Sequence, residues 1–253
     1  MGSTAVPLPW CRPVTNSSPT SVAIVDYGMG NLFSVGHAFA NVGASATVTS
    51  SKAEIMAADI VVLPGVGAFG DAMGSLRRLD LVGPLVDIAT SGRPLIGVCL
   101  GMELLMTTSS EFGTYQGLDI VRGAVVPFAT ESASATPFKV PHVGWSRVYS
   151  ESGARQLQEY SARTWQNPVF EGVGENEYMY FVHSLYCEPE DPGVVTSYSR
   201  YGGVEFCSSF RQSNVFGYQF HPERSGQAGL KMYANLVSMA STGVFENPLS
   251  SPR

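Results

Sequence analysis

The first half of the chain alternates short apolar runs with stretches of helical periodicity. Four apolar runs have the length and composition of buried strands: 22–26, 46–49, 59–63 and 95–98. Helical spacing follows the first run over 31–41 and the last over about 100–107. Buried strands that alternate with helices predict a mostly parallel sheet with helices on both faces.

The pattern changes after about Gly117. Strand-like segments follow one another with few helices between them: 121–128, 178–186, 194–198, 204–211 and 215–220. A final helix is expected over about 227–240, and the composition of 129–137 and 149–167 is typical of loops. We therefore expect antiparallel strands added to a parallel core, in a single α/β domain. The expected boundaries are an extension of residues 1–20, the domain 21–245 and a tail of 246–253.

Composition and charge narrow the class of protein. Of the 253 residues, 44% are hydrophobic and only 14% are charged, which excludes an intrinsically disordered chain. The net charge of −6 and the absence of a basic patch argue against a nucleic-acid partner. The sequence has neither a secretory signal pattern nor an apolar run of about 18 residues. We expect a cytoplasmic enzyme with no membrane partner.

The cysteines indicate reduced thiols rather than a disulfide scaffold. The four of them, Cys11, Cys99, Cys187 and Cys207, are widely separated and include no C-x-x-C pair. Together with the histidines they also lack the short paired spacing of a zinc site. We therefore expect no metal and no cofactor.

Residues 65–70 (GVGAFG) fit the G-x-G-x-x-G pattern that can cradle a dinucleotide. The pattern follows the third apolar run rather than the first. The acidic partner should end the next strand about 20 residues later, but the nearest candidate, Asp87, lies in a helical stretch. A loop that turns backbone N–H groups toward a reacting centre fits better, although dinucleotide binding stays open.

Residues 97–101 (GVCLG) lie where an apolar strand meets a helix. Glycines on both sides of Cys99 are typical of a nucleophile elbow, a tight turn that holds a nucleophile above the sheet. A helix N-terminus should lower the pKa of the thiol and bring the Leu100 N–H near an oxyanion. On this pattern alone, a buried structural cysteine is an equally good interpretation.

The segment FHPE places His221 and Glu223 directly after an apolar strand. A thiol nucleophile needs a base, and the base needs an orienting partner, which these two side chains could supply across the turn at Pro222. A lone structural histidine remains the alternative. His142 and His183 lie among apolar residues and are expected to be core or loop histidines.

Taken together, these motifs resemble those of class I glutamine amidotransferases. The closest resemblance is to the glutaminase subunits of histidine biosynthesis, over about 22–240. It is carried by VAIVDYGMGNL (22–32), LPGVGAFGDAM (63–73), LIGVCLGMELL (95–105), KVPHVGW (139–145), YFVHS (180–184) and FGYQFHPERSG (216–226). The fold implied is a single glutamine amidotransferase-like α/β domain.

The resemblance implies a Cys-His-Glu triad that hydrolyses glutamine. Cys99 would attack the side-chain amide to form a γ-glutamyl thioester, His221 would move the protons, and Glu223 would hold the imidazole. Glu111 matches the carboxylate that pairs with the substrate α-ammonium group. The expected oxyanion and substrate contacts are Gly65, Val66, Gly67, Leu100, Glu103, Glu111, Ser184 and Leu185.

The resemblance also implies a partner. Relatives pass the ammonia to a (β/α)₈-barrel cyclase subunit, which forms imidazole glycerol phosphate and releases a carboxamide aminoimidazole ribonucleotide. A heterodimer is therefore expected, with weak glutaminase activity in the isolated subunit. The residues expected at the interface are Pro141, His142, Trp145 and Arg224.

Four residues depart from the usual pattern of these subunits. Glu103 stands where Gln is usual, and a carboxylate cannot donate amide hydrogen bonds. Arg224 replaces Lys, Ser146 replaces Asn and Leu185 replaces Tyr. The departures leave two alternatives open: a related pathway with another ammonia acceptor, and a non-catalytic binding subunit.

Overall fold

The computed structural model describes residues 18–128, 138–150, 165 and 167–243. The expected loop 129–137, most of 149–167, most of the extension 1–20 and the tail 246–253 lie outside the described residues.

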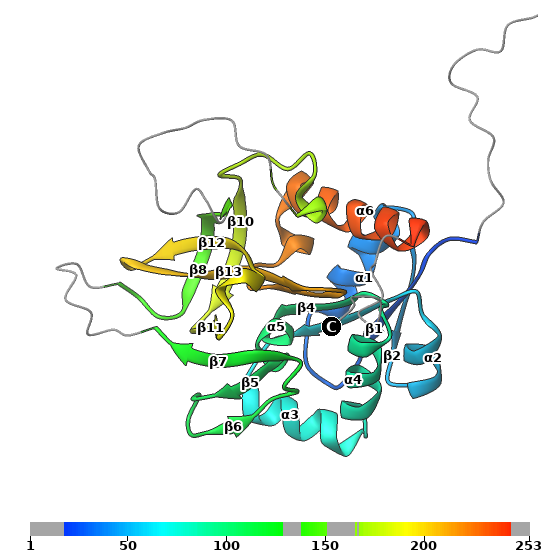
Figure 1. The fold of residues 1–253 in the computed structure, drawn as a ribbon, viewed down its shortest axis with the longest axis horizontal. Coiled ribbons are helices and arrows are strands. Elements are labelled where there is room, and N and C mark those ends of the chain that lie inside the picture. The colour runs from blue at the N-terminus through cyan, green and yellow to red at the C-terminus, as the bar shows by residue number, and fades with distance from the viewer. Residues whose placement is uncertain (1–17, 129–137, 151–164, 166, 244–253) are drawn as a thin grey trace, which may run out of the picture.

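A mixed sheet runs through the molecule (Figure 1). Its parallel part has the order β2 (Ser45–Thr49), β1 (Ser21–Val25), β3 (Ile60–Gly65), β4 (Leu95–Cys99) and β14 (Val215–Tyr218). Beyond β14 it continues with β13 (Val204–Gln212), β11 (Leu185–Pro189), β7 (Val121–Pro127), β5 (Met106–Ser109) and β6 (Tyr115–Gln116). Attached to this path are β12 (Val195–Tyr201) and β9 (Tyr149–Ser150), while β8 (His142–Arg147) and β10 (Tyr178–His183) form a separate antiparallel pair.

Helices cover both faces of the sheet (Figure 1). One face carries α1 (Leu32–Asn41) and α6 (Gly226–Thr242), and the other carries α2 (Lys52–Ala57), α3 (Phe69–Arg78) and α4 (Val82–Thr90). Alternate residues of β1 enter two separate hydrophobic clusters, one on each face. The remaining helical elements are α5 (Leu100–Leu104), η1 (Pro168–Phe170), η2 (Pro192–Val194) and η3 (Pro222–Arg224).

The mixed α/β architecture predicted from the sequence is confirmed, but three local predictions are wrong. Segment 178–186 is not one strand, because the chain breaks at Ser184 and its two parts join different sheets. The helix that follows Cys99 ends at Leu104, since β5 begins at Met106. Strand β8 was not expected, because β10, the strand with which it pairs, lies more than 30 residues further along the chain.

The topology gathers three segments at one edge of the sheet. In the parallel registers, Gly65 of β3 lies opposite Cys99 of β4, and Tyr218 of β14 lies opposite Val98. The carboxyl ends of parallel strands form the usual ligand-binding edge of an α/β sheet. The glycine loop, Cys99 and His221 therefore meet there.

Candidate active site

Cys99 sits on a tight strand-to-helix turn. Its φ of +54° lies in the left-handed region, a backbone conformation that residues other than glycine rarely adopt. A Cβ at Gly101 would lie 1.7 Å from the Leu63 carbonyl oxygen, and one at Gly97 would lie 2.6 Å from the Gly101 carbonyl oxygen. Both flanking glycines are therefore needed for β4 to turn directly into α5, as the G-x-C-x-G pattern predicted.

The Cys99 thiol is buried and faces β10. Its Sγ donates to the Val182 carbonyl oxygen at 3.6 Å. Burial raises the pKa of the thiol well above its ordinary value, and the nearby Glu103 carboxyl raises it further. The Leu100 N–H acts in the opposite direction but does not reverse the shift. The expectation of a lowered thiol pKa is thus wrong for this structure, because the dipole of the five-residue α5 does not offset burial.

His221 and Glu223 form the pair expected from FHPE. His221 Nδ1 and Glu223 Oε1 are 2.8 Å apart, with both side chains buried. The Tyr233 hydroxyl of α6 donates to Glu223 Oε2 at 3.4 Å, so the carboxyl group is held from two sides. Among the described residues, the buried His221 Nε2 has no hydrogen-bond partner. That nitrogen is the one left to exchange a proton with a substrate or a nucleophile.

Strand β10 contacts both Cys99 and His221. The His221 backbone N–H donates to the Tyr180 carbonyl oxygen at 2.9 Å, while the Cys99 thiol donates to the carbonyl oxygen of Val182. Residues two apart in a strand are separated by about 7 Å and direct their carbonyls to the same side. The Cys99 thiol and the His221 backbone therefore contact the same stretch of one strand edge.

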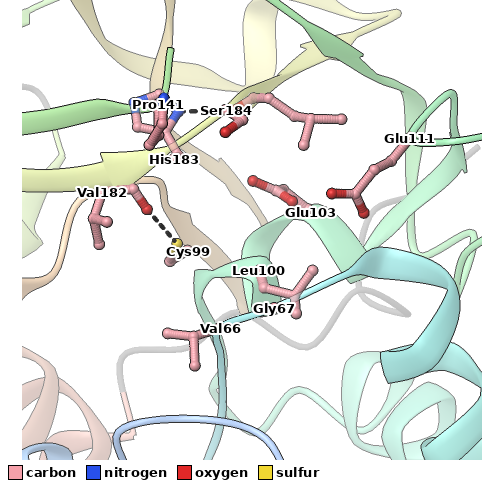
Figure 2. A pocket seen from close by; sticks show the side chains of 11 residues that line it. Val66, Gly67, Cys99, Leu100, Glu103, Glu111, Pro141, Val182, His183 and Ser184 are labelled. Carbon is pink, nitrogen blue, oxygen red and sulfur yellow. Dashed lines mark hydrogen bonds between the residues drawn. The ribbon is translucent and has the colours of Figure 1, made fainter. Parts of the chain in front are cut away.

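A pocket of about 220 Å³ opens beside the thiol (Figure 2). It is lined by Val66, Gly67, Cys99, Leu100, Glu103, Glu111, Pro141, Val182, His183, Ser184 and Leu185. These include all the expected substrate contacts except Gly65, which lies deeper; a Cβ there would meet the Tyr27 hydroxyl at 2.4 Å. His221 and Glu223 are not among the lining residues.

Two carboxyl groups, Glu103 and Glu111, reach into this pocket (Figure 2). The Gln219 amide donates to Glu103 Oε1 at 2.9 Å. Burial raises the pKa of Glu103 to about 8, with a further contribution from the neighbouring Glu111. Glu111 Oε2 accepts the N–H of Phe69, the first residue of α3, at 2.6 Å. A carboxylate at this helix N-terminus occupies the position that a dinucleotide pyrophosphate would need, so the geometry disfavours dinucleotide binding.

The residues expected at a partner interface divide into two groups. Pro141, Trp145 and Arg224 are exposed. The ring centroids of Trp145 and Tyr180 are 5.9 Å apart, and Arg224 Cζ lies 4.2 Å from the Tyr180 centroid. His142, in contrast, is buried against His183, at an Nδ1–Nε2 distance of 3.0 Å. Its side chain faces the interior and is not available to a partner.

Several residues of the site escaped sequence reasoning. Gln219 and Tyr233 hold Glu103 and Glu223, and Val182 contacts the thiol. The position of Gln219 two residues before His221 was an available signal, whereas nothing in the sequence marks Tyr233. Within the described part of the chain, no cluster of three or more His, Cys, Asp or Glu side chains could hold a metal ion, and no helix is long and apolar enough to cross a membrane.

Comparisons with known proteins agree with this geometry. The sequence profile of the family Glutamine amidotransferase class-I matches residues 23–239. The chain is 43% identical over 219 residues to "Imidazole glycerol phosphate synthase subunit HisH" of Syntrophotalea carbinolica, covering 86% of this chain and all of that protein. The subunit of the same name from Rhodopirellula baltica is 42% identical over 211 residues, covering 83% of this chain and 94% of that one.

Solved structures share the fold at lower sequence identity. A glutamine amidotransferase from Thermotoga maritima superposes with a TM-score of 0.57 at 14% identity, over 92% of this chain and 89% of that one. PurLQS from the same organism superposes with a TM-score of 0.62 at 18% identity, over 87% of this chain and 99% of that one. The chain therefore belongs to the class-I glutamine amidotransferase family, within the branch of the HisH subunits of imidazole glycerol phosphate synthase.

Proposed function

We propose that the chain is the glutaminase subunit of imidazole glycerol phosphate synthase and acts in the cytoplasm in histidine biosynthesis. The observation that carries the proposal is the placement of Cys99 and His221 along one edge of β10, beside a pocket lined by the expected glutamine contacts. The identity to HisH subunits over their whole length supports the same assignment. We take 21–245 as the functional domain.

The proposed reaction has two halves. In the first, the Cys99 proton passes to His221 Nε2 as sulfur bonds to the side-chain carbon of glutamine; the C–N bond then breaks and the departing nitrogen takes the proton as ammonia. In the second, His221 deprotonates a water that attacks the γ-glutamyl thioester, and the proton returns to sulfur as glutamate leaves. Glu223 keeps Nδ1 engaged, so that Nε2 faces the reaction.

The oxyanion formed in each half needs N–H donors. Leu100, which follows the nucleophile at the start of α5, is the proposed first donor, and the loop Gly65-Val66-Gly67 is the proposed source of the second. A thiol with a raised pKa is mostly protonated at rest, so attack requires coupled proton transfer to His221. A slow isolated subunit is the expected consequence.

The proposed recipient of the ammonia is a (β/α)₈-barrel cyclase subunit in a heterodimer. A row formed by the exposed Trp145 and Arg224 and the half-buried Tyr180 lies on and beside the β8–β10 pair, next to the pocket wall. Aromatic and arginine side chains are typical of interface centres. We propose that the cyclase docks on this row, with Pro141 at its pocket side.

The test is glutamine hydrolysis with and without the barrel cyclase and its ribonucleotide ligand. We expect strong stimulation by the complex, and covalent labelling of Cys99 by an electrophilic glutamine analogue, detected by mass spectrometry. Cys99→Ala should abolish both activity and labelling. Cys207→Ala is the matched control, since Cys207 is equally buried in β13 away from the pocket, and it should retain both.

The outcomes separate the alternatives. Hydrolysis that survives Cys99→Ala would disprove the assignment of the nucleophile. Absence of labelling in every complex would favour a non-catalytic subunit. Labelling without stimulation by the cyclase, combined with tight binding to another synthase, would favour a different ammonia acceptor.

A further inference from the structure

A buried chain of hydrogen bonds connects β8 to the wall of the pocket. Ser146 Oγ lies 2.9 Å from His142 Nε2, and His142 Nδ1 lies 3.0 Å from His183 Nε2. His183 Nδ1 lies 2.6 Å from the Leu185 carbonyl oxygen. Both histidines are buried, and the glutaminase chemistry proposed above uses neither of them.

The end of this chain fixes the position of every proton in it. A carbonyl oxygen only accepts, so His183 Nδ1 must carry the proton that it shares with Leu185. In a neutral ring His183 Nε2 is then an acceptor, so His142 Nδ1 must donate to it. His142 Nε2 is therefore an acceptor as well, and the Ser146 hydroxyl donates to it. Burial lowers the pKa of His142 to about 4 and that of His183 to about 3, so both rings are neutral at pH 7.

The chain ends where strand β10 breaks into β11. His183, Ser184 and Leu185 all line the pocket, and the strand pairing changes at Ser184 from β8 to β7. The Ser184 carbonyl oxygen accepts the Phe128 N–H at 3.2 Å. The bond from His183 Nδ1 holds the Leu185 carbonyl across that break. The other end is held by ring packing, because His142 stacks on Tyr201 with a centroid distance of 4.0 Å.

We propose that His142 and His183 are positioning residues: through one ordered set of protons they hold the Ser184–Leu185 segment in the geometry that binds glutamine. Neither ring touches the reacting atoms in this scheme. The role rests on the proposed glutaminase function, because its effect is expressed through glutamine binding. Deleting the donor at His142 leaves the buried His183 Nε2 as an acceptor without its partner. The His183 ring is then held only by its bond to Leu185, so the ring and the segment it holds are less firmly positioned.

The test compares two variants in the full chain with its barrel partner. His142→Phe keeps a stacked ring but deletes the donor, whereas His142→Asn restores an N–H near the Nδ1 position but loses the ring. We expect His142→Phe to raise KM for glutamine about tenfold, with kcat changed less than twofold, and His142→Asn to recover most of that loss. A purely structural role predicts the reverse order, because the ring would then matter more than the donor.

A second readout is independent of activity. Nitrogen-15 NMR of labelled histidines should show His183 protonated on Nδ1 in all three proteins. The Nε2 resonance should keep its position in His142→Asn and shift in His142→Phe, where Nε2 loses its hydrogen-bond donor. An Nε2 resonance that stays in place in His142→Phe, or an unchanged KM, would overturn the proposal. If the unchanged protein had no glutaminase activity, the proposed function would fail; the NMR spectra, with glutamine affinity measured by calorimetry, would still decide whether the chain orders the pocket.

Discussion

At the scale of single residues, Glu103 has the largest consequence for electrostatics. Its carboxyl group is buried in the pocket, accepts a hydrogen bond from Gln219, and lies near both the Cys99 thiol and Glu111. An ionised carboxylate there would oppose both the thiolate and the neighbouring carboxylate. The folded protein therefore favours the protonated form, which can donate a hydrogen bond as the amide usual at this position does.

This protonation makes stability depend on pH. The pKa of Glu103 is raised from an ordinary 4.5 to about 8, so between these values the unfolded chain loses a proton that the folded protein keeps. The free energy of unfolding therefore falls as pH rises, by roughly 1 kcal/mol per pH unit for this group, and levels off above about pH 8. Glu103→Gln should remove that slope.

The measurement is urea unfolding of both proteins at several values between pH 5 and 9. The difference in the free energy of unfolding between Glu103→Gln and the unchanged protein should grow in favour of the variant from pH 5 to about 8 and then stay constant. The exposed Glu54→Gln in α2 is the control, and its curve should run parallel to that of the unchanged protein. A parallel curve for Glu103→Gln would show that the carboxyl is ionised in the folded state.

Single residues also mark where sequence reasoning ends. Adjacency along the chain was enough to pair His221 with Glu223 and to place Cys99 on its turn. The pKa of the thiol could not be predicted, because it depends on burial and on Glu103 rather than on the helix that follows. Tyr233 reaches Glu223 from α6, a contact that only tertiary packing creates.

At the scale of elements, the junction between β4 and α5 has the tightest packing of the site. A Cβ at Gly101 would overlap the Leu63 carbonyl oxygen, and the backbone of β3 cannot withdraw without breaking its pairing with β4. We expect Gly101→Ala to lower the free energy of unfolding by more than about 3 kcal/mol and to abolish labelling of Cys99.

Gly74 provides the matched control. It lies within α3, and a Cβ there would meet only the guanidinium end of the Arg78 side chain, at 3.6 Å, which is an ordinary contact. Gly74→Ala should therefore raise the free energy of unfolding by about 0.5 kcal/mol and leave labelling intact. Equal stability of the two variants in urea unfolding would contradict the account of the turn.

Elements with a local pattern were predictable, and those defined by distant partners were not. The parallel strands and α1, α4 and α6 follow from apolar runs and helical spacing. Apolar residues stand on both sides of His183 and Ser184, so the sequence favours one continuous strand and does not mark the break. Only the separate pairings of β10 with β8 and of β11 with β7 reveal it.

At the scale of the whole molecule, the proposed docking row on β8 and β10 leads to a prediction about assembly. Trp145 is 54% exposed, so its removal costs the isolated chain little packing. We expect Trp145→Ala to change the free energy of unfolding by less than about 1 kcal/mol while weakening binding to the barrel cyclase about thirtyfold. Calorimetric titration measures the affinity.

The control for this prediction is another exposed apolar side chain outside the row. Leu79, at the end of α3, is 41% exposed, and α3 covers the sheet away from β8 (Figure 1). Leu79→Ala should leave affinity for the cyclase unchanged. Equal effects of the two substitutions on this affinity would show that the docking row is not part of the interface.

The position of β14 also determines when the active site can exist during synthesis. Cys99 leaves the ribosome 122 residues before His221, and β14 must pair with β4 before the histidine reaches its place. At a synthesis rate of about 10 residues per second, roughly 12 s pass between the addition of Cys99 and that of its proposed base. A nascent chain that has not reached residue 221 therefore lacks the proposed base, and the reactive constellation forms only after β14 has been synthesised and has paired with β4.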